Sequence, residues 1–302
     1  MEKTINEIRR LAKERDAVIL AHYYVDGAVQ DIADYVGDSF YLAKVAKKVQ
    51  NRTIVFCGVT FMGESACILS PDKTVLVPDM GAVCPMALMV DEEEIKRVRG
   101  EYDDLAVVCY INSMAATKAL VDVCVTSSNA LDIVRKLPQK NIYFIPDQNL
   151  GSWIASQMPE KNFIFGKGYC PIHHVISPGD VEEYRAKYPG APVLVHPECP
   201  LEVSRMADYV GSTSGIIERA AKGSEKEFIV CTESGVGHKM RALCPDKTFH
   251  FIEKKICDDM KKITLEKVLE CLKTNEPKAH VPEDVRLKAQ KSLDRMLELG
   301  AK

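Results

Sequence analysis

Several common signatures are missing from this 302-residue sequence. No apolar run approaches the ~18 residues that a membrane-spanning helix needs, and the N-terminal MEKTINEIRR lacks the apolar core of a signal peptide. Lys and Arg total 40 against 43 Asp and Glu, so the basic excess typical of nucleic-acid binders is absent. We therefore expect a cytoplasmic protein that has neither a membrane nor a nucleic acid as its partner.

The cysteines and glycines also lack familiar motifs. None of the 11 cysteines forms a C-x-x-C pair, which excludes zinc ribbons, ferredoxin-type runs and thioredoxin-type motifs. An odd number of cysteines in a reducing compartment argues against a disulfide framework. Neither a Walker A motif nor a complete G-x-G-x-x-G is present, so nucleotide binding has little support. Eight of the 11 cysteines are expected to be small core residues.

What the sequence does contain is a threefold internal repeat. The segment ADYVGDS (33–39) reappears as VDVCVTS (121–127) and as ADYVGST (207–213), at offsets of 88 and 86 residues. A strand-like apolar run precedes each copy: AVILAHYY, LAVVCYIN and APVLVHPE. A second buried run follows each copy, and then a motif that combines a turn with a strand: PDKTVLVPD, PEKNFIFGK and PDKTFHFIE.

Each repeat therefore consists of four short strands that alternate with helices, a pattern typical of parallel sheets covered on both faces. Three repeats give about twelve strands, too many for an eight-stranded barrel. We expect an α/β fold of three small doubly wound αβα lobes, related by a pseudo-threefold axis around a central site. Their expected bounds are 1–102 with a lead-in helix, 103–189, and 190–302 with a closing helix from about Glu283 to Leu299.

One cysteine recurs at the same place in every repeat: Cys84, Cys170 and Cys257. Pro follows the first two and two Asp residues follow the third, so each cysteine is expected to precede a helix whose N-terminus stabilises a thiolate. Three converging thiolates would hold a metal group. A [4Fe–4S] cluster with one iron open to substrate is the favoured interpretation, because such an iron is a Lewis acid. A zinc site completed by His173 or His174 is the alternative.

Hydroxyl side chains recur at a second equivalent position, in Ser39, Ser127 and the pair Ser212–Thr213. Hydroxyls at helix starts bind carboxylate or phosphate groups, so three copies indicate a small substrate with several anionic groups. Further polar residues lie at the matching strand ends: His22, Tyr24, Tyr110, Asn112, His196 and Glu198. Among them Glu198 is the candidate carboxylate base.

Taken together, these motifs resemble the quinolinate synthase family along nearly the whole chain. The matching stretches are LAHYY (20–24), QDIADYVGDS (30–39), CPMA (84–87), YINS (110–113), TSSNA (126–130), PDQNLG (146–151), CPIH (170–173), HPECP (196–200), DYVGST (208–213) and CDDMKKITL (257–265). The set is highly specific, although singly only HPECP and the spaced cysteines are informative.

The resemblance implies condensation of iminoaspartate with dihydroxyacetone phosphate to quinolinate, the NAD precursor, with loss of phosphate and two waters. It implies a three-lobed fold with a [4Fe–4S] cluster held by Cys84, Cys170 and Cys257. Glu198 would be the general base, and Tyr24 and Tyr110 would assist proton transfer and a closing step. The residues implied in binding substrate are His22 (also catalytic), Ser39, Tyr110, Asn112, Ser127, His173, His196, Glu198, Ser212 and Thr213. A functional link to an enzyme that produces iminoaspartate is also expected.

Two other classes of function compete with this interpretation. A zinc-stabilised three-lobed protein could bind small anions without turnover, in which case zinc would be stoichiometric and the visible absorption of an iron–sulfur cluster absent. An iron–sulfur dehydratase could act on another hydroxy acid, and an assay of quinolinate formation would separate it from a quinolinate synthase.

Overall fold

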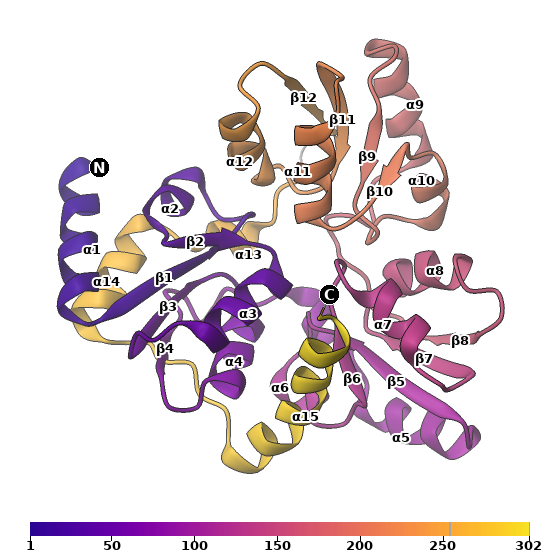
Figure 1. Ribbon diagram of the computed structural model, residues 1–302, viewed down its shortest axis with the longest axis horizontal. Helices are drawn as coiled ribbons and strands as arrows, with labels where there is room; N and C mark the ends of the chain where they lie inside the picture. The colour runs from indigo at the N-terminus through magenta and orange to yellow at the C-terminus, as the bar shows by residue number, and fades with distance from the viewer. Residues whose placement is uncertain (254, 302) are drawn as a thin grey trace. The chain divides into compact units, whose positions relative to one another are not determined.

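The computed structural model describes residues 1–253 and 255–301. Twelve strands in this part of the chain form three four-stranded sheets, ordered β2-β1-β3-β4, β6-β5-β7-β8 and β10-β9-β11-β12 (Figure 1). The expected α/β class, the parallel sheets and the number of strands are confirmed. In every sheet the order reverses beside the first strand of the repeat, which is where open α/β sheets bind ligands at their carboxyl ends.

The first sheet shows why the sequence forms these elements. All five residues of β3, TIVFC, are buried, and runs rich in β-branched residues suit a parallel strand that is covered on both faces. β1 pairs in parallel with both β2 and β3, for example Leu20 with Tyr35 and Ala17 with Thr53. The elements of this repeat are α1 (Glu2–Glu14), β1 (Ala17–His22), α2 (Gly27–Ile32), β2 (Tyr35–Gly37), α3 (Ser39–Lys48), β3 (Thr53–Cys57), α4 (Thr60–Leu69), β4 (Thr74–Leu76), the 3₁₀ turn η1 (Pro85–Leu88) and α5 (Glu92–Glu101).

The other two repeats have the same order of elements. The second consists of β5 (Leu105–Tyr110), α6 (Ala115–Lys118), β6 (Val123–Val125), α7 (Ala130–Lys136), β7 (Asn141–Ile145), α8 (Gln148–Ser156), β8 (Asn162–Phe165) and α9 (Pro178–Lys187). The third consists of β9 (Val193–Val195), α10 (Leu201–Arg205), β10 (Tyr209–Val210), α11 (Thr213–Lys222), β11 (Glu227–Cys231), α12 (Val236–Leu243), β12 (Thr248–Phe251), α13 (Asp258–Lys261), α14 (Leu265–Thr274) and the closing α15 (Glu283–Leu299).

The lysine of the repeated P-[DE]-K motif has the same structural role three times. Lys73, Lys161 and Lys247 each donate hydrogen bonds to two backbone carbonyls where α3, α7 or α11 ends. A cation suits the negative end of a helix dipole, and the last carbonyls of a helix otherwise lack partners. The acceptors are Val49 and Asn51, Leu137 and Gln139, and Ala220 and Gly223.

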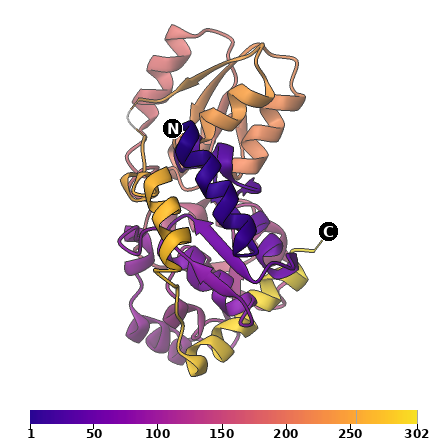
Figure 2. The ribbon, with the colours of Figure 1, turned by 90° about the vertical axis from the view of Figure 1, so that its left-hand side faces the viewer.

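A helix that comes after the fourth strand of each repeat packs on the next sheet. Glu94 of α5 lies beside Tyr143 of β7. Val181 and Tyr184 of α9 are buried in one core with β9 and β11. From the third repeat, α14 packs against α1 and β3 of the first, and Figure 2 shows α1 and α14 side by side. Each sheet is therefore completed by a helix from a different repeat.

The chain divides into two compact units, and both chain ends belong to one of them. The first unit comprises Met1–Leu88, Ile111–Cys124 and Asp258–Lys302, and the second comprises Met89–Tyr110 and Val125–Cys257. In the first unit α15 packs against α4 and α6. The lobe bounds expected from the sequence, and the arrangement of the lobes around a common axis, stay predictions.

None of the helices over residues 1–253 and 255–301 combines the length and the apolar character needed to cross a membrane.

Candidate active site

The first strand of each sheet ends in a buried polar side chain. His22 closes β1, Tyr110 closes β5, and His196 directly follows β9; all three are buried. In the first and third repeats the histidine Nδ1 accepts the backbone N–H two residues later, at 3.2 Å from Tyr24 and 3.4 Å from Glu198. Tyr24 and Glu198 therefore occupy equivalent positions at the carboxyl edges of their sheets.

Glu198 lies among several polar side chains of the second unit. Its side chain is buried, and its Oε2 is 2.7 Å from His173 Nδ1 and 3.6 Å from His196 Nδ1. The rings of His173 and His196 are stacked with centroids 4.7 Å apart and planes 26° apart. The Tyr110 side chain donates a further hydrogen bond to the carboxylate. One carboxylate is therefore held between two imidazoles and a phenol in a buried setting.

His173 is oriented from both of its ring nitrogens. Its Nε2 lies 2.9 Å from Thr232 Oγ1, while its Nδ1 lies 3.2 Å from Cys170 Sγ as well as facing Glu198. A ligand atom from each of Cys170, His173 and Glu198 lies within 4.8 Å of the other two, a spacing that a metal ion could bridge. Metal-binding histidines commonly use their second nitrogen in this way, which fixes the tautomer.

The electrostatics favour the ionised form of Glu198. Burial is the largest single influence on its pKa and opposes the charge, but His196, His173 and the hydrogen bonds from His173 and Tyr110 together outweigh it and lower the pKa to about 2. Nearby, burial and the charge of Glu198 raise the pKa of the Asp147 carboxyl. The pKa values of these two neighbouring buried acids are thus shifted in opposite directions, and only Glu198 is held in its ionised form.

Three residues of this site had not been identified from the sequence: Thr232, Asn149 and Asp147. Asn149 donates its side-chain N–H to the Glu198 carbonyl at 3.0 Å and lies 3.0 Å from His174 Nδ1. His174 therefore contacts this amide, and its ring is also tilted against Tyr169 with centroids 4.3 Å apart. Asn149 and Asp147 belong to the PDQNLG stretch and Thr232 follows a buried strand, but neither spacing nor charge pattern marks them individually.

The cysteines fall into two groups by exposure. Seven of the 11 are buried, and burial raises the pKa of Cys57 and Cys231, as expected for inert core thiols. Four are half-exposed: Cys67, Cys84, Cys170 and Cys257. Cys67 lies within α4 and contacts the Ala279 carbonyl at 3.4 Å, whereas the three repeat-equivalent cysteines lie in loops. No disulfide joins any of the eleven.

The expectation that each of the three loop cysteines precedes a helix is wrong for Cys170. Cys84 and Cys257 precede only the four-residue η1 and α13, and Cys170 is followed by turns rather than by a helix. The reason is that His173, three residues after Cys170, turns back towards its sulfur and towards Glu198. The next helix, α9, begins only at Pro178. A helix dipole at Cys170 is therefore not available to stabilise a thiolate.

Of the predicted hydroxyl residues, Ser39, Ser212 and Thr213 lie at the starts of helices, whereas Ser127 lies in the turn before one. Ser39 is the first residue of α3, Ser127 lies in the turn before α7, and Ser212 caps α11 by accepting the Gly215 N–H at 3.2 Å, directly before Thr213. Each of these helices follows the second strand of its repeat. Asn112 lies just past β5, and its buried Oδ1 has no hydrogen-bond partner among the described residues.

The structure brings together part of the predicted site. Five of the predicted residues form one contact network in the second unit: Tyr110, Cys170, His173, His196 and Glu198. His22 and Tyr24 form a separate pair in the first unit, with ring centroids 4.5 Å apart and planes 84° apart. The predicted site residues that belong to the first unit are His22, Tyr24, Ser39, Cys84 and Asn112. Their convergence with Glu198 stays a prediction.

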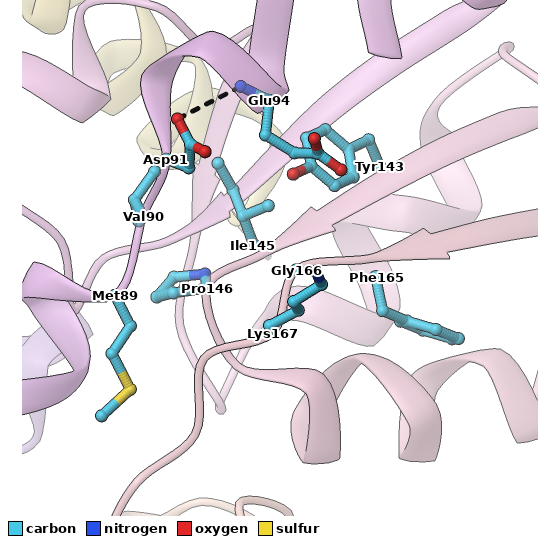
Figure 3. Close-up of a pocket in the computed structure, with 10 residues that line it drawn as sticks. All are labelled: Met89, Val90, Asp91, Glu94, Tyr143, Ile145, Pro146, Phe165, Gly166 and Lys167. Atoms are coloured by element: carbon cyan, nitrogen blue, oxygen red, sulfur yellow. Dashed lines mark hydrogen bonds between the residues drawn. The ribbon is translucent and has the colours of Figure 1, made fainter. Parts of the chain in front are cut away.

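A hollow of about 140 Å³ lies elsewhere in the second unit and carries none of the predicted residues (Figure 3). Glu94 and Tyr143 line it together with Pro146, Phe165 and Lys167. Burial, and then the charge of Glu94, raise the pKa of Tyr143 to about 12, so its phenol stays neutral.

Fold and site together define the class of protein: an α/β enzyme with acid–base residues at the carboxyl edges of parallel sheets, next to a half-exposed thiol. Comparison with known proteins specifies the family. Residues 6–298 match the family model described as quinolinate synthetase A protein, NadA. The chain therefore belongs to the quinolinate synthase family of enzymes, which act in NAD biosynthesis.

Curated relatives support this assignment over the full length. The chain is 52% identical over 295 residues to a quinolinate synthase of Fusobacterium nucleatum, covering 98% of this chain and 99% of the relative. It is 48% identical over 302 residues to that of Clostridioides difficile, covering 99% of each. A third, from Caldicellulosiruptor bescii, is 49% identical over 296 residues, covering 98% of each.

Proposed function

We propose that the chain condenses iminoaspartate with dihydroxyacetone phosphate to quinolinate, releasing phosphate and two waters, with a [4Fe–4S] cluster held by Cys84, Cys170 and Cys257. The observation that carries the proposal is the contact network of Glu198, His173 and Cys170, in which a buried base and a thiol share one histidine. Such a network serves elimination chemistry beside a metal group.

The donor set fits such a cluster. Four of the eleven thiols are half-exposed, and the three in loops are the three at repeat-equivalent positions. Loops leave a sulfur more room to turn towards a metal than the interior of α4 leaves Cys67. Cys84, Cys170 and Cys257 would hold the cluster, and a cluster held by only three protein thiolates would supply an electrophilic iron that polarises a substrate oxygen.

The residues around Glu198 can move protons in both directions. Loss of water needs a base that removes a proton from carbon and an acid that protonates the departing hydroxyl. We assign the first task to the ionised Glu198 and the second to His173, whose Nδ1 is 2.7 Å from the carboxylate. The hydrogen bond between His173 Nε2 and Thr232 keeps the ring oriented while Nδ1 exchanges its proton. Tyr110 and, in the other unit, Tyr24 are assigned supporting roles in proton transfer.

The remaining predicted residues are suited to anionic substrates. Ser39, Ser212 and Thr213 lie at helix starts and Ser127 lies in the turn before α7, places where hydroxyl and backbone N–H groups bind phosphate or carboxylate. Asn112 offers a buried amide oxygen that lacks a protein partner, which suits a substrate hydroxyl or imine N–H. We assign His22 and His196 to the same bound substrates.

The test uses protein purified and reconstituted without oxygen. We expect about four irons per chain, visible iron–sulfur absorption, and quinolinate formed from iminoaspartate and dihydroxyacetone phosphate. Cys170→Ser should lose iron. Cys199→Ser should keep it, because this thiol is buried in the core of the third repeat. Stoichiometric zinc without colour, or iron loss in Cys199→Ser, would overturn the ligand assignment.

We further propose a cytoplasmic location and a supply of iminoaspartate from a separate enzyme. The absence of disulfides among eleven cysteines, three of them half-exposed in loops, suits a reducing compartment. An imine hydrolyses in water, so a source close to the enzyme would limit its loss. Mixing the chain with an iminoaspartate-forming oxidase should raise the yield of quinolinate above that obtained when the two reactions are run in sequence.

A further inference from the structure

A hydrogen bond of the same kind fastens the loop of each repeat-equivalent cysteine to its sheet. In every repeat, the residue that lies three positions past the third strand donates its backbone N–H to the carbonyl two residues before the cysteine. The three bonds are Thr60 to Ala82 at 2.8 Å, Gln148 to Gly168 at 2.9 Å, and Ser234 to Lys255 at 2.9 Å. The backbone of each cysteine loop is thus tied to the carboxyl end of β3, β7 or β11.

The position just before these donors differs among the repeats. It is Val59 in the first, Asp147 in the second and Glu233 in the third, and both acidic side chains are completely buried. Burying a carboxylate is costly unless it is hydrogen-bonded. Because two repeats bury a carboxylate at this position, each carboxylate needs hydrogen-bond donors that offset the cost.

In the third repeat the partner is the cysteine itself. Glu233 Oε1 accepts the backbone N–H of Cys257 at 3.2 Å, and Oε2 accepts the N–H of Gly235 at 2.6 Å. Both carboxylate oxygens are therefore engaged with backbone. Because the sulfur is only two bonds from the cysteine Cα, fixing this N–H limits where the sulfur can go.

The second repeat uses the shorter acid differently. Asp147 Oδ1 accepts the N–H groups of Asn149 and Leu150, each at 2.9 Å, at the start of α8, whereas its buried Oδ2 accepts no hydrogen bond from the described residues. The backbone of Asp147 pairs with Gly168, and the N–H of the next residue, Gln148, holds the Gly168 carbonyl two residues before Cys170. The buried acid thus fixes the start of α8, to which the cysteine loop is tied.

The first repeat holds its cysteine loop without an acidic residue at this position. Val59 cannot accept a hydrogen bond, but the neighbouring Thr60 donates its hydroxyl to the carbonyls of Ala82 at 3.0 Å and Met80 at 3.1 Å. The loop of Cys84 is therefore also held from the strand end, through carbonyls instead of an N–H.

We propose that Asp147 and Glu233 are positioning residues: Asp147 holds the loop of Cys170 through the start of α8, and Glu233 holds the backbone of Cys257 directly, so that both sulfurs are ordered before a metal group binds. They act through the cysteines and do not touch the substrate. This inference rests on the proposed function in one respect, that these cysteines bind iron.

The experiment compares two substitutions at each acid in the full-length protein. Glu233→Met and Asp147→Leu remove every acceptor while preserving bulk, and Glu233→Gln and Asp147→Asn keep one acceptor oxygen. The readouts are iron retained against a chelator after anaerobic reconstitution, the electron paramagnetic resonance spectrum of the reduced cluster, and the rate of thiol modification in metal-free protein. Asp208→Asn is the matched control, because Asp208 accepts the Val193 N–H at 2.8 Å at the opposite end of its sheet.

We expect the Met and Leu variants to retain iron roughly 10- to 100-fold less well, as is typical when partners of metal ligands are lost, and to react faster at their loop thiols. Gln and Asn should give intermediate retention and a perturbed resonance spectrum, and Asp208→Asn should match the wild type. Folded Met and Leu variants that match the wild type in iron retention would overturn the inference. If they do not fold, Gln and Asn variants with wild-type retention and spectrum would overturn it.

Failure of the proposed function is recognised separately. In that case the wild type itself holds no iron. The thiol measurement on metal-free protein still decides whether the carboxylates order Cys170 and Cys257: unchanged modification rates in every variant would overturn the inference, and faster rates would support it.

Discussion

At the scale of single residues, the site depends on the Glu198 carboxylate, on whose pKa burial and the neighbouring side chains have opposite effects. Burial disfavours the charge of Glu198, while His173, His196 and Tyr110 favour it strongly enough to keep the carboxylate ionised. A base that is already ionised needs no proton release before it acts. Its strength then depends on how readily His173 exchanges the shared proton, so the two residues work as a pair.

Replacing Glu198 by Gln tests this directly. The amide keeps the size and cannot accept a proton from carbon, so turnover should fall by ~10²–10⁴-fold while the iron content stays unchanged. Steady-state quinolinate formation and iron analysis of the same sample measure the two effects. Glu202→Gln, an exposed change in α10, is the control and should leave both unaltered. Near-normal turnover in Glu198→Gln would remove this residue from the mechanism.

At the scale of elements, the repeat is visible in the hydrogen bonds at the carboxyl ends of three helices. The lysines of the P-[DE]-K motif bind carbonyls at the ends of α3, α7 and α11 alike, and the sequence shows the motif but not this role. Its purpose emerges only in three dimensions, because the acceptor carbonyls lie 22 to 27 residues earlier in the chain.

Lys161→Met should therefore destabilise the second repeat. The change leaves the carbonyls of Leu137 and Gln139 without their charged donor, which lies at 2.8 Å from each. Hydrogen bonds from charged groups contribute about 1.5–3 kcal/mol, so we expect the free energy of unfolding to fall by about 1–3 kcal/mol. Urea denaturation measures it, and Lys140→Met, at an exposed lysine nearby, should change it little.

A second prediction at this scale concerns acid. The hydrogen bond from Arg219 on α11, and then a backbone hydrogen bond, lower the pKa of Glu225 from 4.5 to about 2. A carboxylate with a lowered pKa stabilises the fold above its unfolded value and loses that contribution as pH falls through the folded value.

The stability difference between wild type and Glu225→Gln should therefore be constant above about pH 5 and shrink between pH 4.5 and 2. Thermal unfolding measured across this range tests the sign. High salt should reduce the difference, because the pair is close to solvent. A difference that grows as the pH falls would contradict the assignment.

At the scale of the whole molecule, the sequence predicted more than is usual because the pattern occurs three times. A single Cys or Ser carries little information, but the recurrence of Cys84, Cys170 and Cys257 at offsets of 86 and 87 residues separates them from eight other thiols. The hydroxyls at helix starts were found in the same way.

What escaped prediction has a common physical cause. Thr232, Asn149 and Glu233 act on neighbours that are distant in sequence, through a ring nitrogen or backbone groups. Their partners are set by the packing of loops and not by any local pattern. The missing helix after Cys170 has the same origin, since the direction of the His173 side chain is decided by contacts with Glu198.

The closing helix gives a prediction for the molecule as a whole. Leu293 of α15 is completely buried, and α15 packs on α4 and α6. Leu293→Ala should lower the free energy of unfolding by about 2–5 kcal/mol, as large-to-small changes in a core do. Hydrogen exchange should accelerate in α4 and α6 and stay unchanged in α9, which belongs to the other unit. Equal acceleration in all three helices would contradict this division.

The transfer of a helix from each repeat to the next sheet has a consequence for synthesis. A nascent chain exposes β1 and β3 early, yet α14, which covers them together with α1, leaves the ribosome near the end. The second unit, ending at Cys257, is complete in sequence before that moment. Domains form as their residues emerge, so the segment translated first is the last to acquire its full core, and truncated products would show it uncovered.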